Sequence, residues 1–202
     1  MTQAIGRLRV AVAEDERDTR EFFAQMVNGL GHEVVGTAQT GRELAALCRA
    51  QRPDLVITDI KMPDMDGIDA ATHLYQEAPV PVILVSAFHE PELIARAEAD
   101  HILGYLVKPI KQSDLEPTIA LAMKRFEQFE ALRKEAADLR QALEDRKLIE
   151  RAKGLLMKKV GLDEQEAFRR LQKVAMDSNR RMAEVAQMVL TAEEAFQPKA
   201  KV

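Results

Sequence analysis

The feature of the sequence that most constrains the fold is an alternation of short apolar runs with helical patterns in its N-terminal part. Five runs predict strands, over residues 8–14, 33–39, 55–58, 81–87 and 104–109. Amphipathic segments lie between them, the last over residues 92–99. Right-handed crossovers put helices on both faces of a parallel sheet, and strands this apolar fit burial from both sides. We therefore predict an α/β fold built on a five-stranded parallel sheet.

The next part of the sequence predicts one long helix. A capping box from Ser113 to Glu116 indicates its start, with Pro117 in the first turn, and no further glycine or proline occurs until Gly154. Apolar residues recur along it at alternating steps of three and four, the spacing of a coiled coil: Phe129, Leu132, Ala136, Leu139 and Leu143. The alternative is a lone helix packed on its own domain, but the narrow apolar stripe favours a two-helix seam.

A small helical module is predicted to follow. Asp163 with Glu166 indicates the cap of one helix, and Ser178 or Asn179 the cap of the last. Residues at helical spacing predict its core: Leu148, Ile149, Ala152, Leu155 and Leu156 on one helix, and Phe168 with Leu171 on the next. The C-terminal part is therefore expected to be small and all-α.

Charge also separates the two parts of the chain. Residues 1–122 carry 11 Lys and Arg against 19 Asp and Glu, a net −8, whereas residues 123–202 carry 18 against 14, a net +4. Within the second part, residues 146–181 carry 11 basic and 5 acidic side chains, a net +6. An acidic N-terminal part and a basic C-terminal part indicate two domains with different partners, although a basic segment can also be merely solvated.

The single cysteine and the absence of long apolar runs bear on the compartment. Cys48 lies in a helical pattern, so a disulfide framework is excluded and a buried, inert thiol is expected. No apolar run approaches the roughly 18 residues that span a membrane. We therefore expect a cytoplasmic protein that has no membrane partner.

Acidic and polar side chains stand at the carboxyl ends of four predicted strands. Glu14 and Asp15 stand at the end of the first strand, Asp59 follows the third, and Ser86 and Lys108 stand at the ends of the fourth and fifth. In open parallel sheets these strand ends meet at one edge, and ligands bind there. Taken singly, Asp59 fits an ordinary turn and Lys108 a surface lysine. Together, the five side chains predict one pocket.

The chemistry of such a pocket points to a metal ion and a phosphoryl group. Three carboxylates at close quarters repel one another, and a divalent cation relieves the repulsion. Hard oxygen ligands without His or Cys favour Mg²⁺, which also binds phosphate. A carboxylate can then attack phosphorus and form an acyl phosphate while a lysine offsets the developing charge. We predict Asp59 as the reacting carboxylate, with Asp64 and Asp66 shaping the turn after it.

The motifs AED, TDIKMPDMDG, VSA and YLVKP, in this order over residues 6–122, resemble the receiver domain of two-component response regulators. The resemblance implies a flavodoxin-like, doubly wound sheet with strand order 2-1-3-4-5 and phosphorylation of Asp59 by a sensor histidine kinase. It also implies a cis peptide between Lys108 and Pro109. Ser86 and Tyr105 match the family's switch residues.

The same resemblance implies a ligand set for Mg²⁺. The ion would be held by Asp15, Asp59 and the backbone carbonyl of Lys61, and Glu14 would act through a water. The family often has Asp where this chain has Glu14, and Thr where it has Ser86. Both replacements keep the functional group.

The stretches ERAKGLLM, EAFRRLQKVAMDSNRR and EVAQMV resemble the ANTAR domain of transcription antitermination regulators. The resemblance implies three small helices that bind RNA hairpins, whereas the residues alone would not separate RNA from DNA. No exposed Tyr or Trp is expected in this module. Recognition should therefore depend on charge, close approach to the backbone and polar contacts.

Two groups of residues are candidate RNA contacts. They are Lys147, Arg151, Lys153, Gly154 and Lys158 on the first helix of the module, and Ser178, Asn179, Arg180 and Arg181 at the predicted start of its last helix. A glycine in a basic stripe lets a phosphate or base approach the backbone, and amides at a helix start suit an anion. The alternatives are a solvated face on which Gly154 permits helix–helix contact, and ordinary capping at Ser178.

These inferences give three regions: a receiver domain over residues 1–122, a coiled-coil linker over 123–145, and an ANTAR domain over 146–202. We expect a phosphorylation-controlled response regulator that binds RNA hairpins and acts by transcription antitermination, as a homodimer when phosphorylated. It is expected to be a phosphoacceptor with at most slow autodephosphorylation, not an enzyme. The alternatives are a DNA-binding response regulator and a signalling hub that acts through protein contacts only.

Overall fold

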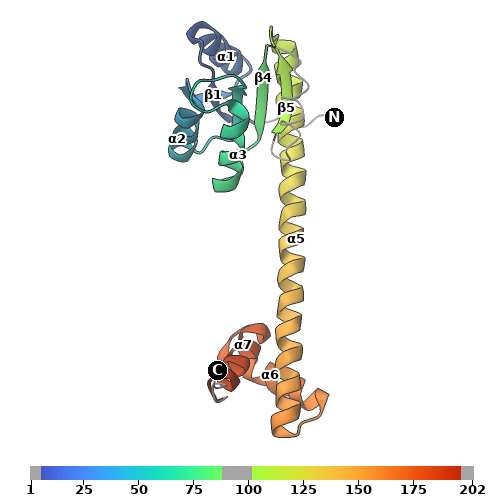
Figure 1. Cartoon of the computed structure of the whole chain (residues 1–202). Coiled ribbons are helices and arrows are strands. Elements are labelled where there is room, and N and C mark those ends of the chain that lie inside the picture. The colour runs from blue at the N-terminus through green and yellow to red at the C-terminus, as the bar shows by residue number, and fades with distance from the viewer. Residues whose placement is uncertain (1–5, 88–101, 197–202) are drawn as a thin grey trace. The chain divides into compact units, whose positions relative to one another are not determined.

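The chain, as a computed structural model that describes residues 6–87 and 102–196, divides into two compact units. The first unit covers residues 1–131 and the second covers residues 132–202. Helix α5 (Gln112–Val160) is 49 residues long and contributes residues to both units (Figure 1). Each unit has a hydrophobic core of its own.

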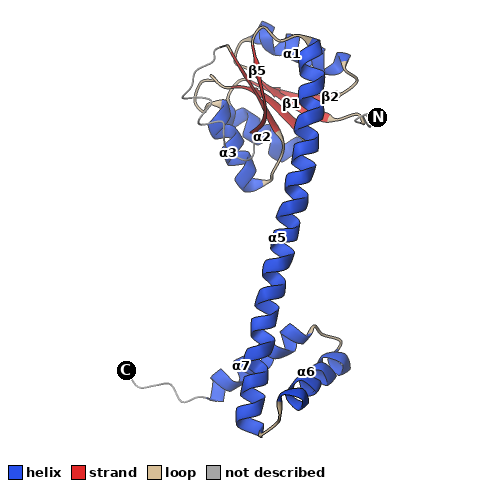
Figure 2. Ribbon diagram, turned by 90° about the vertical axis from the view of Figure 1, so that its right-hand side faces the viewer, coloured by secondary structure: helices blue, strands red, loops and turns tan. Residues whose placement is uncertain are grey.

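The first unit is built on a five-stranded parallel sheet in the order β2-β1-β3-β4-β5, drawn in red in Figure 2. Its strands are β1 (Arg9–Ala13), β2 (Glu33–Ala38), β3 (Leu55–Asp59), β4 (Val82–Ser86) and β5 (Ile102–Val107). The structure confirms the predicted fold class and strand order, and each strand lies within two residues of its prediction. β3 and β4 are buried along their whole length, because strands flank both of their edges and helices cover both faces.

Helices cover both faces of this sheet. α2 (Gly41–Gln51) and α3 (Gly67–Glu77) contribute Leu44 and Leu74 to the core on one face. α1 (Arg17–Gly29) and the beginning of α5 contribute Phe23 and Ile119 to the core on the other. Successive residues of β1 alternate between the two cores, as the period of a strand requires. The helix predicted over residues 92–99 lies outside the described residues.

The start of α5 differs from the prediction. The helix begins at Gln112, so Ser113 lies inside its first turn, where its hydroxyl donates to the Asp114 carboxylate at 3.2 Å. The predicted capping box starting at Ser113 is therefore wrong. Pro117 lies within the helix, near its start, as expected.

The second unit consists of the C-terminal part of α5 with α6 (Glu164–Ser178) and α7 (Met182–Phe196). Ala152, Leu171 and Ala186 are among the buried residues of its core, and the other predicted core residues of α5 pack against this core. Asp163 and Glu166 form the predicted capping box at the start of α6. The expectation for Phe168 is wrong, because its side chain is 39% exposed.

Cys48 is buried in α2, as predicted. Burial raises the pKa of its thiol to about 12, so the thiol is protonated at neutral pH and is not a nucleophile. Among the helices that the structure describes, none is both long enough and apolar enough to cross a membrane.

Candidate functional site

The structure brings the predicted pocket residues to one edge of the sheet. Glu14 follows β1 directly, Asp59 is the last residue of β3, Ser86 is the last of β4, and Lys108 follows β5. These positions coincide because all five strands are parallel, so that their carboxyl ends lie together. The local sequence thus delivers its acids, a hydroxyl and an ammonium to one place.

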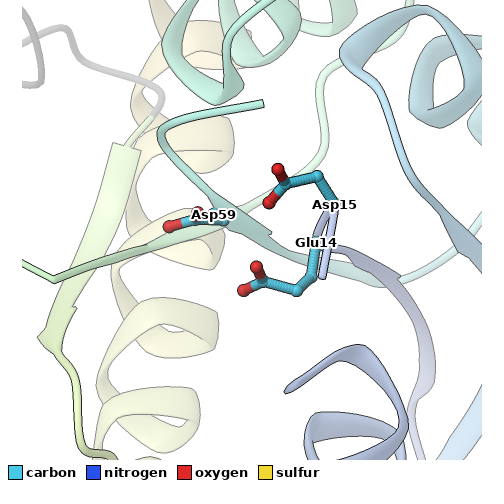
Figure 3. A group of neighbouring side chains, drawn as sticks. All are labelled: Glu14, Asp15 and Asp59. Atoms are coloured by element: carbon cyan, nitrogen blue, oxygen red, sulfur yellow. The ribbon is translucent and has the colours of Figure 1, made fainter. Parts of the chain in front are cut away.

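Three carboxylates form the centre of this edge. Oxygen atoms of Glu14, Asp15 and Asp59 lie within 4.8 Å of one another, and Figure 3 shows the three side chains directed toward a common space. Glu14 is 1% exposed and Asp59 is 6% exposed, whereas Asp15 is open to solvent. The Lys108 ammonium lies 2.7 Å from Glu14 Oε2 and 3.4 Å from Asp59 Oδ2.

Burial and mutual repulsion govern the ionisation of this group. Burial raises the pKa of Glu14 and of Asp59 above the ordinary range, and neighbouring acids add to the effect, while Lys108 opposes it. For Lys108, burial favours the neutral amine, but its contacts with Glu14 and Asp59 outweigh burial and raise the pKa of its ammonium. Lys108 therefore stays charged and offsets one of three negative charges.

The remaining charge of this cluster fits a divalent cation. Three carboxylates and one ammonium leave a net charge of −2 when all are ionised, and the donors are hard oxygens at a spacing that one ion can bridge. Among the described residues, this is the group of acids whose geometry could hold a metal ion. The donor set is the one that Mg²⁺ prefers.

The remaining predicted pocket residues occupy the same edge or its loops. Ser86 is 3% exposed and pairs in register with Val107, the residue before Lys108. Tyr105 is half-buried in β5 and packs against the core formed with α2 and α3. Lys61 lies two residues after Asp59 with an exposed side chain. The Lys108–Pro109 peptide is cis, as expected.

The loop after Asp59 is built around two acids and a glycine. Asp64 adopts a left-handed backbone with φ 72°, and Asp66 caps α3 by accepting a hydrogen bond from the Asp69 amide at 2.8 Å. Both residues shape the turn, as predicted. A Cβ added to Gly67 would lie 2.1 Å from the carbonyl oxygen of Asp59. The loop therefore folds back directly onto the backbone of Asp59.

Arg20 is a pocket residue that the sequence did not reveal. From α1, its guanidinium donates to the backbone carbonyls of Glu14 at 2.6 Å and Asp15 at 3.1 Å. These bonds hold the loop that presents both carboxylates. An arginine one turn into a helix has many surface roles, so the sequence carried no signal for this one.

In the second unit, the basic stripe of α5 is exposed around an open glycine. Arg151, Gly154 and Lys158 line a hollow with residues of α7, among them Leu190 and Glu193. A Cβ added to Gly154 would meet nothing within 4 Å. Within the described chain, no neighbouring helix packs closely against this glycine, and its backbone is accessible from outside.

Lys153 differs from its neighbours on the stripe. It is 6% exposed, and its ammonium binds Glu150 at 3.0 Å and Glu164 at 2.8 Å. Glu164 is the first residue of α6, so this pair ties α5 to the start of α6. Lys147 is exposed and pairs with Glu144 at 2.6 Å.

The second group of candidate contacts lies at the turn between α6 and α7. Ser178 ends α6 and donates to the Val174 carbonyl at 2.6 Å, and Asn179 closes the helix in a left-handed conformation with φ 52°. The predicted capping of the last helix by either residue is therefore wrong, because α7 begins only at Met182. Arg181 pairs with Glu184 at 2.9 Å.

Arg180 and Arg181 make other contacts from this turn. Arg180 lies against the Met188 sulfur at 2.9 Å, and Arg181 approaches Asp145 of α5 at 3.6 Å. Asn179, Arg180 and Arg181 line a shallow hollow together with Met176. The turn thus presents polar and basic groups beside an exposed methionine.

Two family models match the chain. The response regulator receiver domain matches residues 10–120, and the ANTAR domain matches residues 137–190. The chain is an ANTAR-type response regulator. Both domains are those of a signalling regulator, and the acidic edge of the sheet lies within the receiver match.

Relatives of this response regulator fall into two groups. The transcriptional regulatory protein PdtaR of Mycobacterium tuberculosis is 46% identical over 182 residues, covering 90% of this chain and 89% of the relative. An uncharacterized response regulatory protein of Staphylococcus epidermidis is 33% identical over 120 residues, covering 58% of this chain and 47% of the relative. The match to PdtaR therefore extends through both domains.

Solved structures are similar to part of this response regulator. The receiver domain of the response regulator NarL from Mycobacterium tuberculosis is 30% identical with a TM-score of 0.55, covering 58% of this chain and 97% of that one. The anti-anti-sigma factor PhyR from Bartonella quintana is 32% identical with a TM-score of 0.54, covering 67% and 53%.

Proposed function

We propose that phosphorylation of Asp59 controls the binding of RNA hairpins by the ANTAR module, and that the bound hairpin prevents a transcription terminator from forming. The observation that carries the proposal is the cluster of Glu14, Asp15, Asp59 and Lys108 in a chain that also has a basic stripe around an open Gly154. The first is suited to phosphoryl transfer and the second to nucleic acid. The relative PdtaR is described as a transcriptional regulator.

In the proposed transfer, an Asp59 carboxylate oxygen attacks the phosphorus of a phosphohistidine on a sensor kinase. An O–P bond forms on Asp59 and the P–N bond to the histidine breaks. Asp15, Asp59 and the Lys61 carbonyl would hold Mg²⁺, with Glu14 acting through a water, and the ion would offset the charge of the phosphoryl group. Lys108, 3.4 Å from Asp59, adds a second positive charge. Slow hydrolysis of the acyl phosphate would reset the protein.

The switch in this proposal uses Ser86 and Tyr105. The Ser86 hydroxyl donates to a phosphoryl oxygen, and its movement opens space into which the half-buried Tyr105 ring turns. Phosphorylation shifts the population between two receiver states only as far as the phosphoryl group stabilises one state more than the other. A nearly complete shift requires a difference of a few kcal/mol. Ser86 and Tyr105 are the side chains whose positions would differ between the two states.

We place the RNA contacts on the stripe Lys147, Arg151, Gly154 and Lys158 and at the turn formed by residues 178–181. Lys153 was predicted as part of the same surface, but its ion pairs with Glu150 and Glu164 hold its ammonium, so we assign it a positioning role. Phosphate contacts should make affinity fall steeply with salt. We propose that this event takes place in the cytoplasm.

We further propose that the active form is a homodimer joined through a coiled coil. Leu132, Leu139 and Leu143 are 65%, 60% and 59% exposed, at the a and d spacing of a heptad repeat. A second copy of this helix would cover them. Phe129 is half-buried against Tyr75, with ring centroids 6.2 Å apart, so the seam is best placed from Leu132 onward. The proposed boundaries are residues 1–122, 123–145 and 146–202.

The test compares RNA binding with and without a phosphodonor. Acetyl phosphate or beryllofluoride should raise the affinity of the full chain for its hairpin by about tenfold or more. Asp59→Asn should abolish the rise, while Asp64→Asn, in the same loop, should keep it. Binding is measured by filter retention, and phosphorylation by retarded migration in a phosphate-affinity gel.

Other outcomes of this test would contradict the proposal. Equal affinity with and without phosphodonor would separate the receiver from RNA binding. Preference for duplex DNA over hairpin RNA would favour a DNA-binding regulator. Full output from a chain in which Arg151 and Lys158 are changed to Glu would favour a hub that acts through protein contacts.

A further inference from the structure

The outer side of α6 carries a set of side chains that the proposed function leaves unused. They are Gln165, Phe168, Arg169, Gln172, Lys173 and Met176, and their spacing of three and four residues places them on one side of the helix. We name this set the α6 face. The buried residues of the same helix, Ala167, Leu171 and Ala175, point to the core of the module from a different side.

The α6 face presents apolar surface to solvent and joins two hollows. Phe168 is 39% exposed and Met176 is 75% exposed. At one end, Phe168 lines a hollow with Gln165 and Arg169. At the other end, Gln172 and Met176 line the hollow of the turn between α6 and α7. A single ligand lying along α6 could therefore contact both hollows.

The charge of this helix favours a polyanion as that ligand. Between Glu166 and Asp177, α6 carries Arg169, Arg170 and Lys173 and no carboxylate. In the part of the chain that the structure describes, none of these three cations forms an ion pair, whereas Lys153 is neutralised by two glutamates. Their charge is therefore available to phosphates.

The exposed aromatic ring decides which polyanion fits. A regular duplex buries its bases in the stack, so it would use the cations of the α6 face but leave Phe168 without a partner. An unpaired base offers a flat face that an aromatic side chain can cover. The neighbouring Gln165 amide can both donate to and accept from a base edge. An RNA loop matches the ring, the amide and the cations together.

We propose that the α6 face binds the unpaired loop of the RNA hairpin, with Phe168 stacked on one base and Arg169 and Lys173 against the flanking phosphates. The proposal rests on RNA binding as the function of the module. It adds a second contact surface to the stripe of α5, and it replaces the expectation that no aromatic ring takes part in recognition.

The experiment uses the full chain, treated with acetyl phosphate, and an RNA hairpin that the wild-type protein selects from a pool with a randomised loop. Phe168→Leu keeps an apolar side chain but removes the ring, and should weaken binding by about tenfold to a hundredfold. Phe168→Tyr should bind as the wild type does. Val174→Ala is the matched control, because Val174 is 45% exposed on the opposite side of α6.

A fluorescent purine analogue, placed in turn at each loop position of the hairpin, reports stacking directly. At one position the wild type should quench it, and Phe168→Leu should not, although thermal unfolding shows that the variant is folded. Arg169→Glu with Lys173→Glu should weaken binding and lower its salt dependence.

Three results would overturn the inference in distinguishable ways. If the Phe168→Leu variant bound the hairpin with wild-type affinity, Phe168 would not stack on a base, and the proposed function would remain intact. Unchanged affinity after both Arg169 and Lys173 are changed to Glu would remove the phosphate contacts from the α6 face. Failure of the wild type to select any RNA would overturn the proposed function itself.

Discussion

The receiver pocket and the ANTAR module both depend on charged side chains, but they hold them in opposite ways. In the pocket, Glu14 and Asp59 are almost completely buried, and Lys108 lies within ion-pair distance of both. On the module, Arg151 and Lys158 are exposed. Buried charges interact strongly at fixed distances, whereas exposed charges are screened by water and salt.

This difference teaches what kind of function each region can support. A pocket of coupled, buried groups can hold one small ligand in one geometry, and the loss of one group changes all the others. A surface of exposed cations can hold an extended polyanion through several weak contacts, each contributing a part. Changes in the pocket should therefore act in an all-or-none way, and changes on the module in a graded way.

Two glycines offer the sharpest way to break this comparison. Gly67→Ala should have the larger effect, because the added Cβ would lie 2.1 Å from the Asp59 carbonyl oxygen and 3.1 Å from Thr58 Oγ1. We expect a loss of roughly 3 kcal/mol in the free energy of unfolding, or a displaced Asp59. Urea denaturation measures the first and phosphorylation by acetyl phosphate measures the second. A variant with wild-type values in both would show that the loop adapts freely.

Gly154→Ala should have a smaller effect and one of opposite sign on stability. Its Cβ meets nothing, and alanine in a helix interior is favoured over glycine by about 1 kcal/mol. We expect a more stable protein with several-fold weaker RNA binding, because the methyl group stands where a phosphate or base approaches. Thermal unfolding and filter binding on one preparation test both parts. Increased stability with unchanged RNA affinity would show that the stripe does not use its open backbone.

The smallest expected effect is the pH dependence carried by His32. Burial lowers the pKa of its imidazole below 6.5, and its Nδ1 accepts a hydrogen bond from the Leu8 amide at 3.3 Å. The folded state therefore binds fewer protons than the unfolded state just below pH 6.5. His32 contributes its full stability above that pH and loses it as the pH falls through the folded-state pKa.

The measurement for His32 is urea denaturation at several pH values between about 5.5 and 7.5. His32→Asn, whose amide oxygen can still accept from Leu8, should flatten the slope in this range. The same slope in both proteins would assign the pH dependence to other groups and leave His32 with a packing role only.

The strands and the pocket could be predicted because both follow from local patterns. Each strand is an apolar run of the right length. Parallel topology brings the carboxyl ends of all strands to one edge, so the proximity of Asp59 and Lys108 follows from the topology alone. The capping boxes were predicted less reliably. Asp163 with Glu166 formed as expected, whereas Ser113 did not cap its helix, because α5 begins one residue earlier.

In the helical module, the sequence failed where the surroundings of a side chain depended on a neighbouring helix. Phe168 and Leu171 are both compatible with a core position by spacing, yet Leu171 is 1% exposed and Phe168 is 39% exposed. Lys153 reads as one more lysine of a basic stripe, but the start of α6 places Glu164 against it. The rotation of each helix about its axis depends on the neighbouring helices. The helical repeat in the sequence does not determine this rotation.

By itself, the sequence determined the element order, the two-domain organisation and the position of the acidic edge of the sheet, since these depend on periodicity and on the direction of parallel strands. Only the tertiary structure decided which charged groups are neutralised within the protein and which remain available. That decision depends on distances of a few ångströms between side chains far apart in the chain, such as Lys108 and Glu14 across 94 residues. Coulomb interactions and desolvation change steeply over such distances.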